Sequence, residues 1–396
     1  MSLIFDQRAS LQGQSALHAL IIGVSDYPHL PKNGDPPTEN SFGMEKLSSP
    51  ALSAYRVFEW LSSRATSHPV PLASCRMLLL PSAAEIATEP GLAAFAGGWG
   101  INEVVTDAAA WRQDASQVRD SRTFFYFAGH GARRSQHDCV MILPGFGSGA
   151  GGILAACIDT STLRDGMAPT ARFPDIARTQ MYVVDACRIT PQEFRQFERM
   201  PTYGVFDVEV NDIDDRKAPI FYAAIPGTVA IGRKGKQTLF SDALLQCLRG
   251  AAGEAMEEDP AGNVPWRVSV TSLNEALVKI VNALNDQFGT DQQFEPGASV
   301  PFEICKLAAA PKVKVMLRLS PEQAGNAGKL SVTNSLGDAV WTLAPPLGPL
   351  PLSNTLEAGN YRIEISFGSP NLPFRNYTRL KMILPPQVEL TARCSP

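Results

Sequence analysis

The stretch F-F-Y-F-A-G-H-G at residues 124–131 decides the fold when it is read together with Y-V-V-D-A-C-R at residues 182–188. Each stretch begins as a continuous apolar run and ends in small or chemically reactive residues. Apolar runs bounded in this way are typical of strands that are buried on both faces of a parallel sheet. His130 and Cys187 therefore fall at the carboxyl ends of two predicted strands, which is where active sites of open α/β sheets lie.

The same pattern continues on both sides of these stretches. Apolar runs predict strands at residues 18–25, 76–80, 123–127, 181–184 and 220–225, with an added strand or hairpin arm at 138–143. Helical spacing of apolar residues predicts helices at 50–61, 101–111, 241–248 and 273–284. Strands that alternate with helices imply an α/β fold, with a mostly parallel sheet flanked by helices.

The composition changes after about residue 307. Apolar residues alternate with other residues at 313–319 and 361–367, and turns rich in Pro and Gly separate these runs. This pattern predicts a small all-β, sandwich-like C-terminal domain. The expected organisation is an N-terminal extension at 1–15, the α/β domain at 16–307 with a polar internal linker at 189–219 and a small part at 220–307, and the β domain at 312–396.

The bulk composition limits the classes of function. Hydrophobic residues make up 44% of the 396 residues and charged residues 19%, which indicates a globular rather than a disordered chain. The formal net charge of −4 gives no reason to expect nucleic acid or an anionic membrane as the partner. No signal peptide pattern and no membrane-spanning apolar run is visible, so a soluble cytoplasmic protein is expected.

The cysteines predict neither disulfides nor a metal centre. There are seven of them, widely spaced and without a C-x-x-C pair. The acidic residues at 254–259 are interpreted as a solvated loop in preference to a calcium site. The glycine-rich stretch 145–152 lacks the G-K-[ST] ending of a phosphate-binding loop. No cofactor and no metal are therefore expected.

His130 and Cys187 are the residues that could carry chemistry. A cysteine hydrolase needs a thiol, a histidine that exchanges a proton with it, and main-chain amides that bind the oxyanion. The sequence offers Cys187 as the nucleophile, His130 as the general acid and base, and the amides of Gly131 and Cys187 as oxyanion donors. The alternatives are a buried structural histidine and an inert core cysteine.

At these residues the chain resembles the caspase/metacaspase superfamily, whose members have a strand ending in S-G-H-G or a near variant and a later strand ending in a motif centred on A-C. The segments A-L-I-I-G-V at 19–24, F-Y-A-A-I-P-G at 221–227 and L-F-S-D-A-L-L at 239–245 also resemble family elements, in family order. The resemblance covers residues 16–307. It implies a Cys-His dyad, endopeptidase activity on protein substrates, and a large part followed by a small part.

The predicted specificity depends on Asp185, two residues before the nucleophile. The resemblance aligns it with an aspartate of metacaspases, and a carboxylate there would favour Arg or Lys before the cleaved bond through a charge-assisted pair. Ser53 stands where metacaspases have a second acidic residue, and Asp26 is a further candidate for the substrate pocket. Cleavage after Asp, and a purely structural role for Asp185, are the alternatives.

The polar linker 189–219 corresponds to the segment that caspases cut during activation. Arg195, Arg199, Arg216 and Lys217 are the predicted processing positions, for self-cleavage or for an upstream activating protease. A solvated surface loop is the alternative. The resemblance also implies a bacterial zymogen that acts in cell death or antiviral defence.

Two other functions remain open at this stage. One is a catalytically silent caspase-like scaffold that binds partners. The other is an amidase or transferase that uses the same thiol but ignores long peptides.

Overall fold

The computed structural model describes residues 2–38, 40–135, 139–149, 152–191, 200–207, 213–260, 264–298 and 300–395. The chain forms two compact units, the first made of residues 1–245 and 281–302 and the second of residues 246–280 and 303–396. The boundary expected between residues 307 and 312 stays a prediction.

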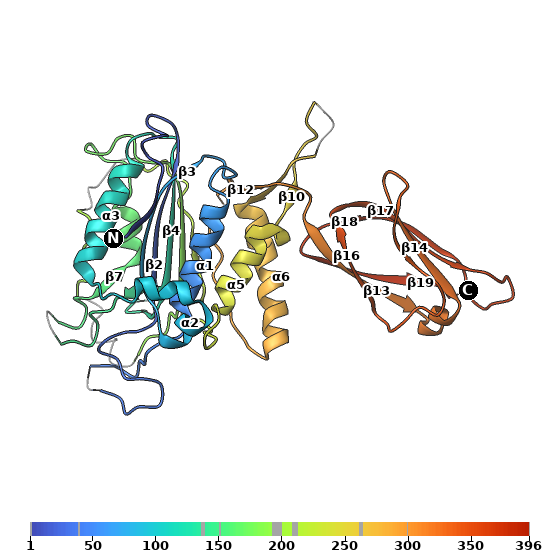
Figure 1. Cartoon of the computed structure of the whole chain (residues 1–396), viewed down its shortest axis with the longest axis horizontal. Coiled ribbons are helices and arrows are strands. Elements are labelled where there is room, and N and C mark those ends of the chain that lie inside the picture. The colour runs from blue at the N-terminus through green and yellow to red at the C-terminus, as the bar shows by residue number, and fades with distance from the viewer. Residues whose placement is uncertain are drawn as a thin grey trace. The chain divides into compact units, whose positions relative to one another are not determined.

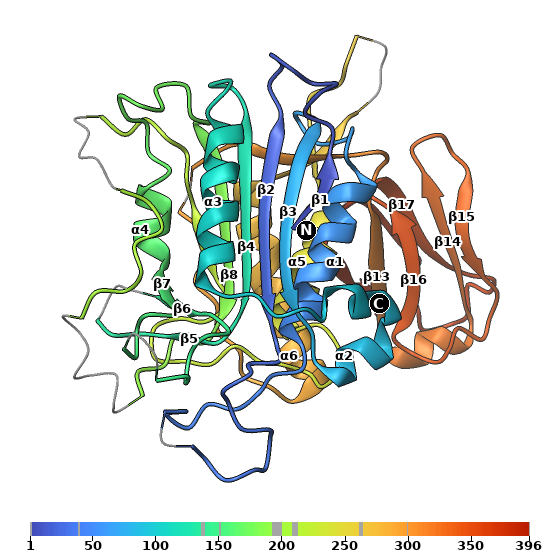
Figure 2. The same ribbon diagram turned by 60° about the vertical axis from the view of Figure 1, so that its left-hand side comes forward.

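The first unit is built on a six-stranded sheet in the order β1-β3-β2-β4-β8-β9. Its strands are β1 (Leu3–Asp6), β2 (Leu17–Val24), β3 (Leu72–Leu80), β4 (Arg122–Gly129), β8 (Thr179–Ala186) and β9 (Ile220–Tyr222). Only β1 is antiparallel to its neighbour, and the other pairs are parallel (Figure 2). The α/β prediction is confirmed, because the apolar runs form strands buried along almost their whole length.

Helices cover both faces of this sheet. The two that pack on it are α1 (Pro50–Ser63) and α3 (Ile101–Ala115), and α2 (Ala83–Thr88) and a 3₁₀ turn at Pro90–Phe95 are short. Figure 1 shows α3 and α1 on opposite sides of the sheet. A Cβ on Gly23 would come within 2.6 Å of the Ala54 Cβ, so α1 packs on β2 at a distance that only glycine allows. The other long helices are α5 (Leu239–Gln246) and α6 (Val270–Phe288), and the division between the two units falls within α6.

Shorter elements surround the carboxyl end of the sheet. A three-stranded sheet in the order β5-β6-β7 is formed by β5 (Gly131–Ala132), β6 (Val140–Ile142) and β7 (Cys157–Asp159), and α4 (Thr160–Asp165) follows it. The hairpin arm predicted near residues 138–143 is therefore present as β6. Because β5 begins two residues after β4 ends, this small sheet fixes the path of the chain immediately after His130.

The second unit contains a sheet β10-β11-β12 and two further sheets, β16-β13-β19 and β15-β14-β17-β18. These strands are β10 (Glu254–Ala255), β11 (Trp266–Ser269), β12 (Glu303–Leu307), β13 (Lys312–Ser320), β14 (Gly328–Asn334), β15 (Ala339–Leu343), β16 (Leu352–Glu357), β17 (Gly359–Phe367), β18 (Tyr377–Ile383) and β19 (Gln387–Arg393). The alternating residues of β13 point Val313, Val315 and Leu317 into a shared core, as the period of two requires. A π-helical turn (Cys247–Ala251) and a 3₁₀ turn (Glu322–Asn326) complete the unit. Among the residues that the structure describes, no helix is both long and apolar enough to cross a membrane.

Candidate active site

The register between β4 and β8 brings His130 and Cys187 together. The two strands are parallel neighbours, and their last paired residues are Gly129 and Ala186. One further step in this register sets His130 beside Cys187, and residues that stand opposite each other point to the same face of a sheet. Adjacent strands lie about 4.8 Å apart. The main chains of two residues that are 57 positions apart in the sequence therefore lie at neighbouring ends of β4 and β8, and their pairing as catalytic residues stays a prediction.

Main-chain and tyrosine contacts position the His130 ring. Its Nε2 lies 2.6 Å from the carbonyl oxygen of Glu45. A carbonyl can only accept, so Nε2 carries the proton and Nδ1 carries the lone pair of the neutral ring. The Tyr27 hydroxyl accepts the His130 main-chain N–H at 2.8 Å and donates to the Ile142 carbonyl at 2.9 Å, and its ring lies 4.9 Å from the imidazole. Burial lowers the pKa of His130 to about 4. The hydrogen bond to the Glu45 carbonyl raises the pKa and so opposes part of this effect.

The thiol of Cys187 is half-buried and lies against one main-chain group. The N–H of Ala230 points at Sγ at 3.3 Å, and the Ala230 carbonyl lies 3.8 Å from Sγ. Burial raises the pKa of Cys187, the Ala230 N–H opposes this, and the nearby charge of Asp185 raises it further. Thiol and imidazole are thus both neutral in this arrangement, and the imidazole has a lone pair that can take the thiol proton.

Gly131 lies directly against the carboxyl end of β8. A Cβ at this position would stand 2.5 Å from the carbonyl oxygen of Cys187 and 2.7 Å from the Cβ of Ala186. No side chain fits there, so the two main chains can approach closely only because residue 131 is glycine. The role of the Gly131 and Cys187 amides as oxyanion donors stays a prediction.

Asp185 lies at the centre of a buried polar cluster. Its Oδ2 accepts from the Tyr126 hydroxyl at 2.9 Å and from the Thr238 hydroxyl at 2.5 Å, whereas its Oδ1 is fully buried and has no hydrogen-bond partner. Ser53 joins the cluster through Thr238, whose main-chain N–H donates to the Ser53 hydroxyl at 2.9 Å. Burial raises the pKa of Asp185 to about 6, and the bonds from Thr238 and Tyr126 oppose this. The structure thus brings together Asp185 and Ser53, two of the three predicted pocket residues.

The third candidate, Asp26, is engaged elsewhere. Its carboxylate pairs with Lys46 at 2.6 Å and its side chain is 47% exposed. Among the described residues no hydrogen bond joins it to the Asp185 cluster, so its assignment to the substrate pocket stays a prediction.

The residue after the nucleophile is also held firmly. The Arg188 guanidinium forms an ion pair with Glu295 and lies 4.2 Å from the centre of the Tyr222 ring. Its carbonyl accepts the Gly227 main-chain N–H at 2.8 Å, and its own main-chain N–H donates to the Thr228 carbonyl at 3.0 Å. These contacts fix the turn on which Cys187 stands.

Two basic residues of the linker lie in its described part, and both are held by hydrogen bonds. Arg195 and Arg199 lie outside the described residues. Contrary to the expectation of an exposed loop, the Arg216 side chain is 1% exposed, pairs with Asp214 at 2.6 Å and donates to the Arg164 carbonyl at 2.6 Å. The main chain of Lys217 bonds Arg178 and Gln180 at 2.8 Å each. Cleavage after Arg216 or Lys217 would therefore require this stretch to open first, and the four processing positions stay a prediction.

Several contributing residues were not singled out from the sequence. Tyr27, Glu45 and Ala230 act through main-chain groups or long-range contacts, which leave no pattern in the sequence. Thr238 ends a basic, glycine-broken segment whose composition gives no sign of burial, yet it is 4% exposed. Tyr126 carried a usable signal, because its hydroxyl interrupts the otherwise apolar strand F-F-Y-F and a buried hydroxyl needs a partner. Of the described residues, no group of three His, Cys, Asp or Glu could hold a metal ion.

Comparison with known proteins gives a family for the part of the chain that carries this site. Residues 98–294 match the family model described as the caspase domain. Among solved structures, the chain is similar to protein GSU0716 from Geobacter sulfurreducens, with 11% identity, a TM-score of 0.40, and coverage of 73% of this chain and 94% of that one. It is also similar to caspase-1 from Spodoptera frugiperda, with 11% identity, a TM-score of 0.36, and coverage of 74% and 88%. No curated protein matches the chain.

Proposed function

The chain carries a domain of the caspase superfamily at residues 98–294, and from this premise we propose that it is a cysteine endopeptidase in which His130 and Cys187 form the catalytic pair. One observation supports this assignment above all others. The register Gly129–Ala186 sets the two residues side by side, at the carboxyl ends of neighbouring parallel strands within the matched segment.

The proposed reaction follows from the protonation states of the pair. Nδ1 of His130 takes the thiol proton as Sγ of Cys187 attacks the scissile carbonyl carbon, and the carbonyl oxygen becomes an oxyanion beside the amides of Gly131 and Cys187. The imidazolium then gives its proton to the leaving amine as the C–N bond breaks, which leaves an acyl thioester on Cys187. A water molecule that loses its proton to His130 hydrolyses the thioester and regenerates the thiol. Throughout, Glu45 holds Nε2–H and so keeps Nδ1 toward the reacting atoms.

The preference for Arg or Lys before the scissile bond is part of the same proposal. The buried Oδ1 of Asp185 has no partner, and a substrate guanidinium or ammonium would supply the missing donor and the opposite charge. Buried carboxylates without such a partner are energetically unfavourable, so a cationic substrate group gains from pairing there. An aspartate in the substrate would meet a like charge.

The described state has features of a resting enzyme. Ala230 occupies the immediate surroundings of Sγ with both its N–H and its carbonyl, so a substrate carbonyl needs this segment to shift. We therefore propose that the protein is a zymogen, activated by cleavage within residues 189–219, either by itself or by an upstream protease. A cytoplasmic role in bacterial cell death or antiviral defence rests on the family resemblance alone.

Digestion of a peptide library by the purified full-length protein, with products identified by mass, tests the activity. The protein is assayed intact and after limited nicking in the linker, alongside Cys187→Ala and the matched control Cys75→Ala. Cleavage after Arg or Lys that is lost in Cys187→Ala and kept in Cys75→Ala supports the proposal. Cleavage that survives Cys187→Ala refutes the catalytic assignment, and cleavage after Asp refutes the specificity.

The second candidate function is a catalytically silent scaffold. It is favoured by one observation, the contact of Ala230 with a neutral thiol. Absence of cleavage in both the intact and the nicked protein, together with no reaction of Cys187 with iodoacetamide in the nicked form, would favour this function over the peptidase.

A further inference from the structure

A second cavity lies at the opposite end of the sheet from His130 and Cys187. Its volume is about 610 Å³, which is within the range of small-molecule sites. It is enclosed by the turn after β1, the amino-terminal ends of β2 and β3, and the residues that follow α3. The eight residues of β2 separate this end of the sheet from the other by roughly 26 Å, at about 3.3 Å per residue. This cavity is therefore distinct from the catalytic pair.

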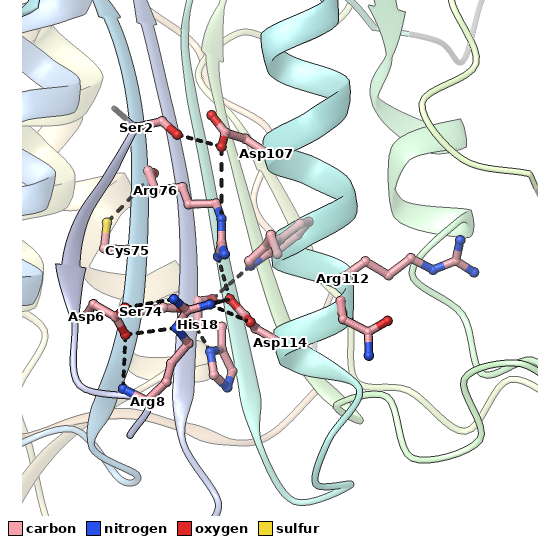
Figure 3. Close-up of polar contacts among 12 residues, drawn as sticks. Ser2, Asp6, Arg8, His18, Ser74, Cys75, Arg76, Asp107, Arg112 and Asp114 are labelled. Carbon is pink, nitrogen blue, oxygen red and sulfur yellow. Dashed lines mark hydrogen bonds and ion pairs between the residues drawn. The ribbon is translucent and has the colours of Figure 1, made fainter. Parts of the chain in front are cut away.

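One wall of the cavity is a chain of ion pairs that neutralise each other (Figure 3). Asp114 accepts from Arg76 at 2.5 Å and from Arg8 at 3.0 Å, and Arg8 in turn holds Asp6 through two bonds of 2.7 and 2.8 Å. Two guanidinium groups thus face three carboxylates, because Asp107 also lies 4.0 Å from Arg76, and each of these charged groups has an oppositely charged partner. A charged ligand would find no uncompensated opposite charge here, and this favours an uncharged one.

His18 is a further polar group in the cavity lining, and it is only 6% exposed. Its Nδ1 lies 2.9 Å from the Ser74 hydroxyl, which lies 3.3 Å from Asp114. The single Ser74 proton goes to the carboxylate, so the hydroxyl oxygen accepts the Nδ1–H of His18 and the lone pair of the neutral ring is on Nε2. In the part of the chain that the structure describes, no hydrogen bond of Nε2 is present. An acceptor in the cavity lining is thus left for a donor that enters the cavity.

We propose that this cavity binds an uncharged nitrogen heterocycle of nucleoside size, which donates an N–H to Nε2 of His18. The Arg8 guanidinium, held in place by Asp6 and Asp114, offers a planar face on which such a ring can stack. The side-chain amides of Gln12, Gln14 and Gln117 line the same cavity and can bond the polar edges of the ring or its sugar. The site does not depend on the proposed peptidase activity.

Calorimetric titration of the full-length protein with adenosine, guanosine, cytidine and uridine tests the proposal, with 1,3,7-trimethylxanthine as the ring that has no N–H donor. Gln117→Trp places a large side chain in the cavity, and Gln113→Trp makes the same substitution one helical turn earlier, outside the cavity lining. His18→Phe removes the acceptor and should weaken binding about tenfold, as expected for one buried hydrogen bond. Melting temperatures of all three variants report whether they fold.

Binding of at least one nucleoside, at least tenfold weaker in Gln117→Trp and unchanged in Gln113→Trp, is the expected result. The trimethylated ring should not bind. The proposal is overturned if no nucleoside binds, if the trimethylated ring binds as tightly as a nucleoside, or if Gln117→Trp keeps the affinity of the unmodified protein. If His18→Phe does not fold, the affinities of Gln117→Trp and Gln113→Trp for the nucleoside decide whether the cavity is the binding site. Peptide cleavage by Gln117→Trp is measured in parallel, and it should not change.

Discussion

Replacing Asp185 by Asn removes the negative charge but keeps an oxygen that can accept from Tyr126 and Thr238. If Asp185 binds the Arg or Lys side chain before the scissile bond, the variant loses one hydrogen bond between charged groups. Such a bond is worth about 1.5–3 kcal/mol, which corresponds to a loss of roughly 10–150-fold in kcat/KM. The loss should fall on cationic substrates alone, because an uncharged side chain gains nothing from the charge.

The assay compares two fluorogenic peptides that differ only in having Arg or citrulline before the scissile bond. Citrulline has nearly the shape of Arg but no charge, so Asp185→Asn should reduce the preference for Arg and leave kcat/KM for the citrulline peptide nearly unchanged. Asp26→Asn is the matched control, since Asp26 is an exposed carboxylate paired with Lys46. Equal losses on both peptides, or the same selective loss in Asp26→Asn, would refute the assignment of Asp185 to the substrate pocket.

The same variant has a predicted effect on stability. Burial raises the pKa of Asp185 from the usual 3.8 to about 6, so the folded state binds a proton more tightly than the unfolded state. The ionised carboxylate therefore destabilises the fold above pH 6, by about 3 kcal/mol at 1.36 kcal/mol per pKa unit, and this penalty is relieved as the pH falls from 6 to 3.8. Between pH 7 and pH 5 the unmodified protein should gain about 1 kcal/mol in free energy of unfolding relative to Asp185→Asn. Urea denaturation at both pH values measures this difference, and equal changes in the two proteins would contradict the raised pKa.

Three other predictions concern the catalytic pair. Gly131→Ala should lower kcat/KM by about 100-fold or more, because its Cβ would meet the Cys187 carbonyl oxygen at 2.5 Å. Gly97→Ala is the control, since a Cβ there has open space and should leave kcat/KM unchanged. Equal kcat/KM values in the two variants would disprove the close approach. Tyr27→Phe removes the hydroxyl that accepts from the His130 main chain, and we expect about 1–2 kcal/mol less stability by urea denaturation and a lower kcat; unchanged values for both would show that the hydroxyl does not position His130. The acid limb of the pH profile of kcat/KM should lie near pH 4 rather than 6.5, because burial favours the neutral imidazole of His130. The free energy of unfolding should fall as the pH falls from 6.5 through 4, because the unfolded state binds the His130 proton more tightly. An acid limb at 6.5 would mean that His130 is solvated in the active form.

A large part of the fold could be predicted from local pattern. The apolar runs that end at Gly129 and Ala186 became β4 and β8, and helix periodicity located α1 and α3. Their boundaries moved by at most four residues, and the helix starts at Pro50 and Ile101 did not move. One side chain of the linker differs from the expectation. Arg216 was expected in an exposed loop but is buried against Asp214 and Arg164, and an ion pair of this kind is decided by the surroundings of the chain.

The sequence by itself determined the chemistry that is available. It placed a histidine and a cysteine at the ends of two strands, an aspartate two residues before the cysteine, and glycines where the main chain has to turn or approach closely. These features are local, and a strand or a turn is specified by residues that are near one another in the chain.

Only the tertiary structure decided how these groups are tuned. Strand register sets His130 beside Cys187, Glu45 selects the tautomer of the imidazole, and Ala230 lies against the thiol. The pocket cluster around Asp185 is likewise assembled from segments that lie far apart along the chain. The physical reason is that burial and hydrogen bonding, which set the pKa of each group, depend on what surrounds it in space, and the neighbours in space come from distant parts of the sequence.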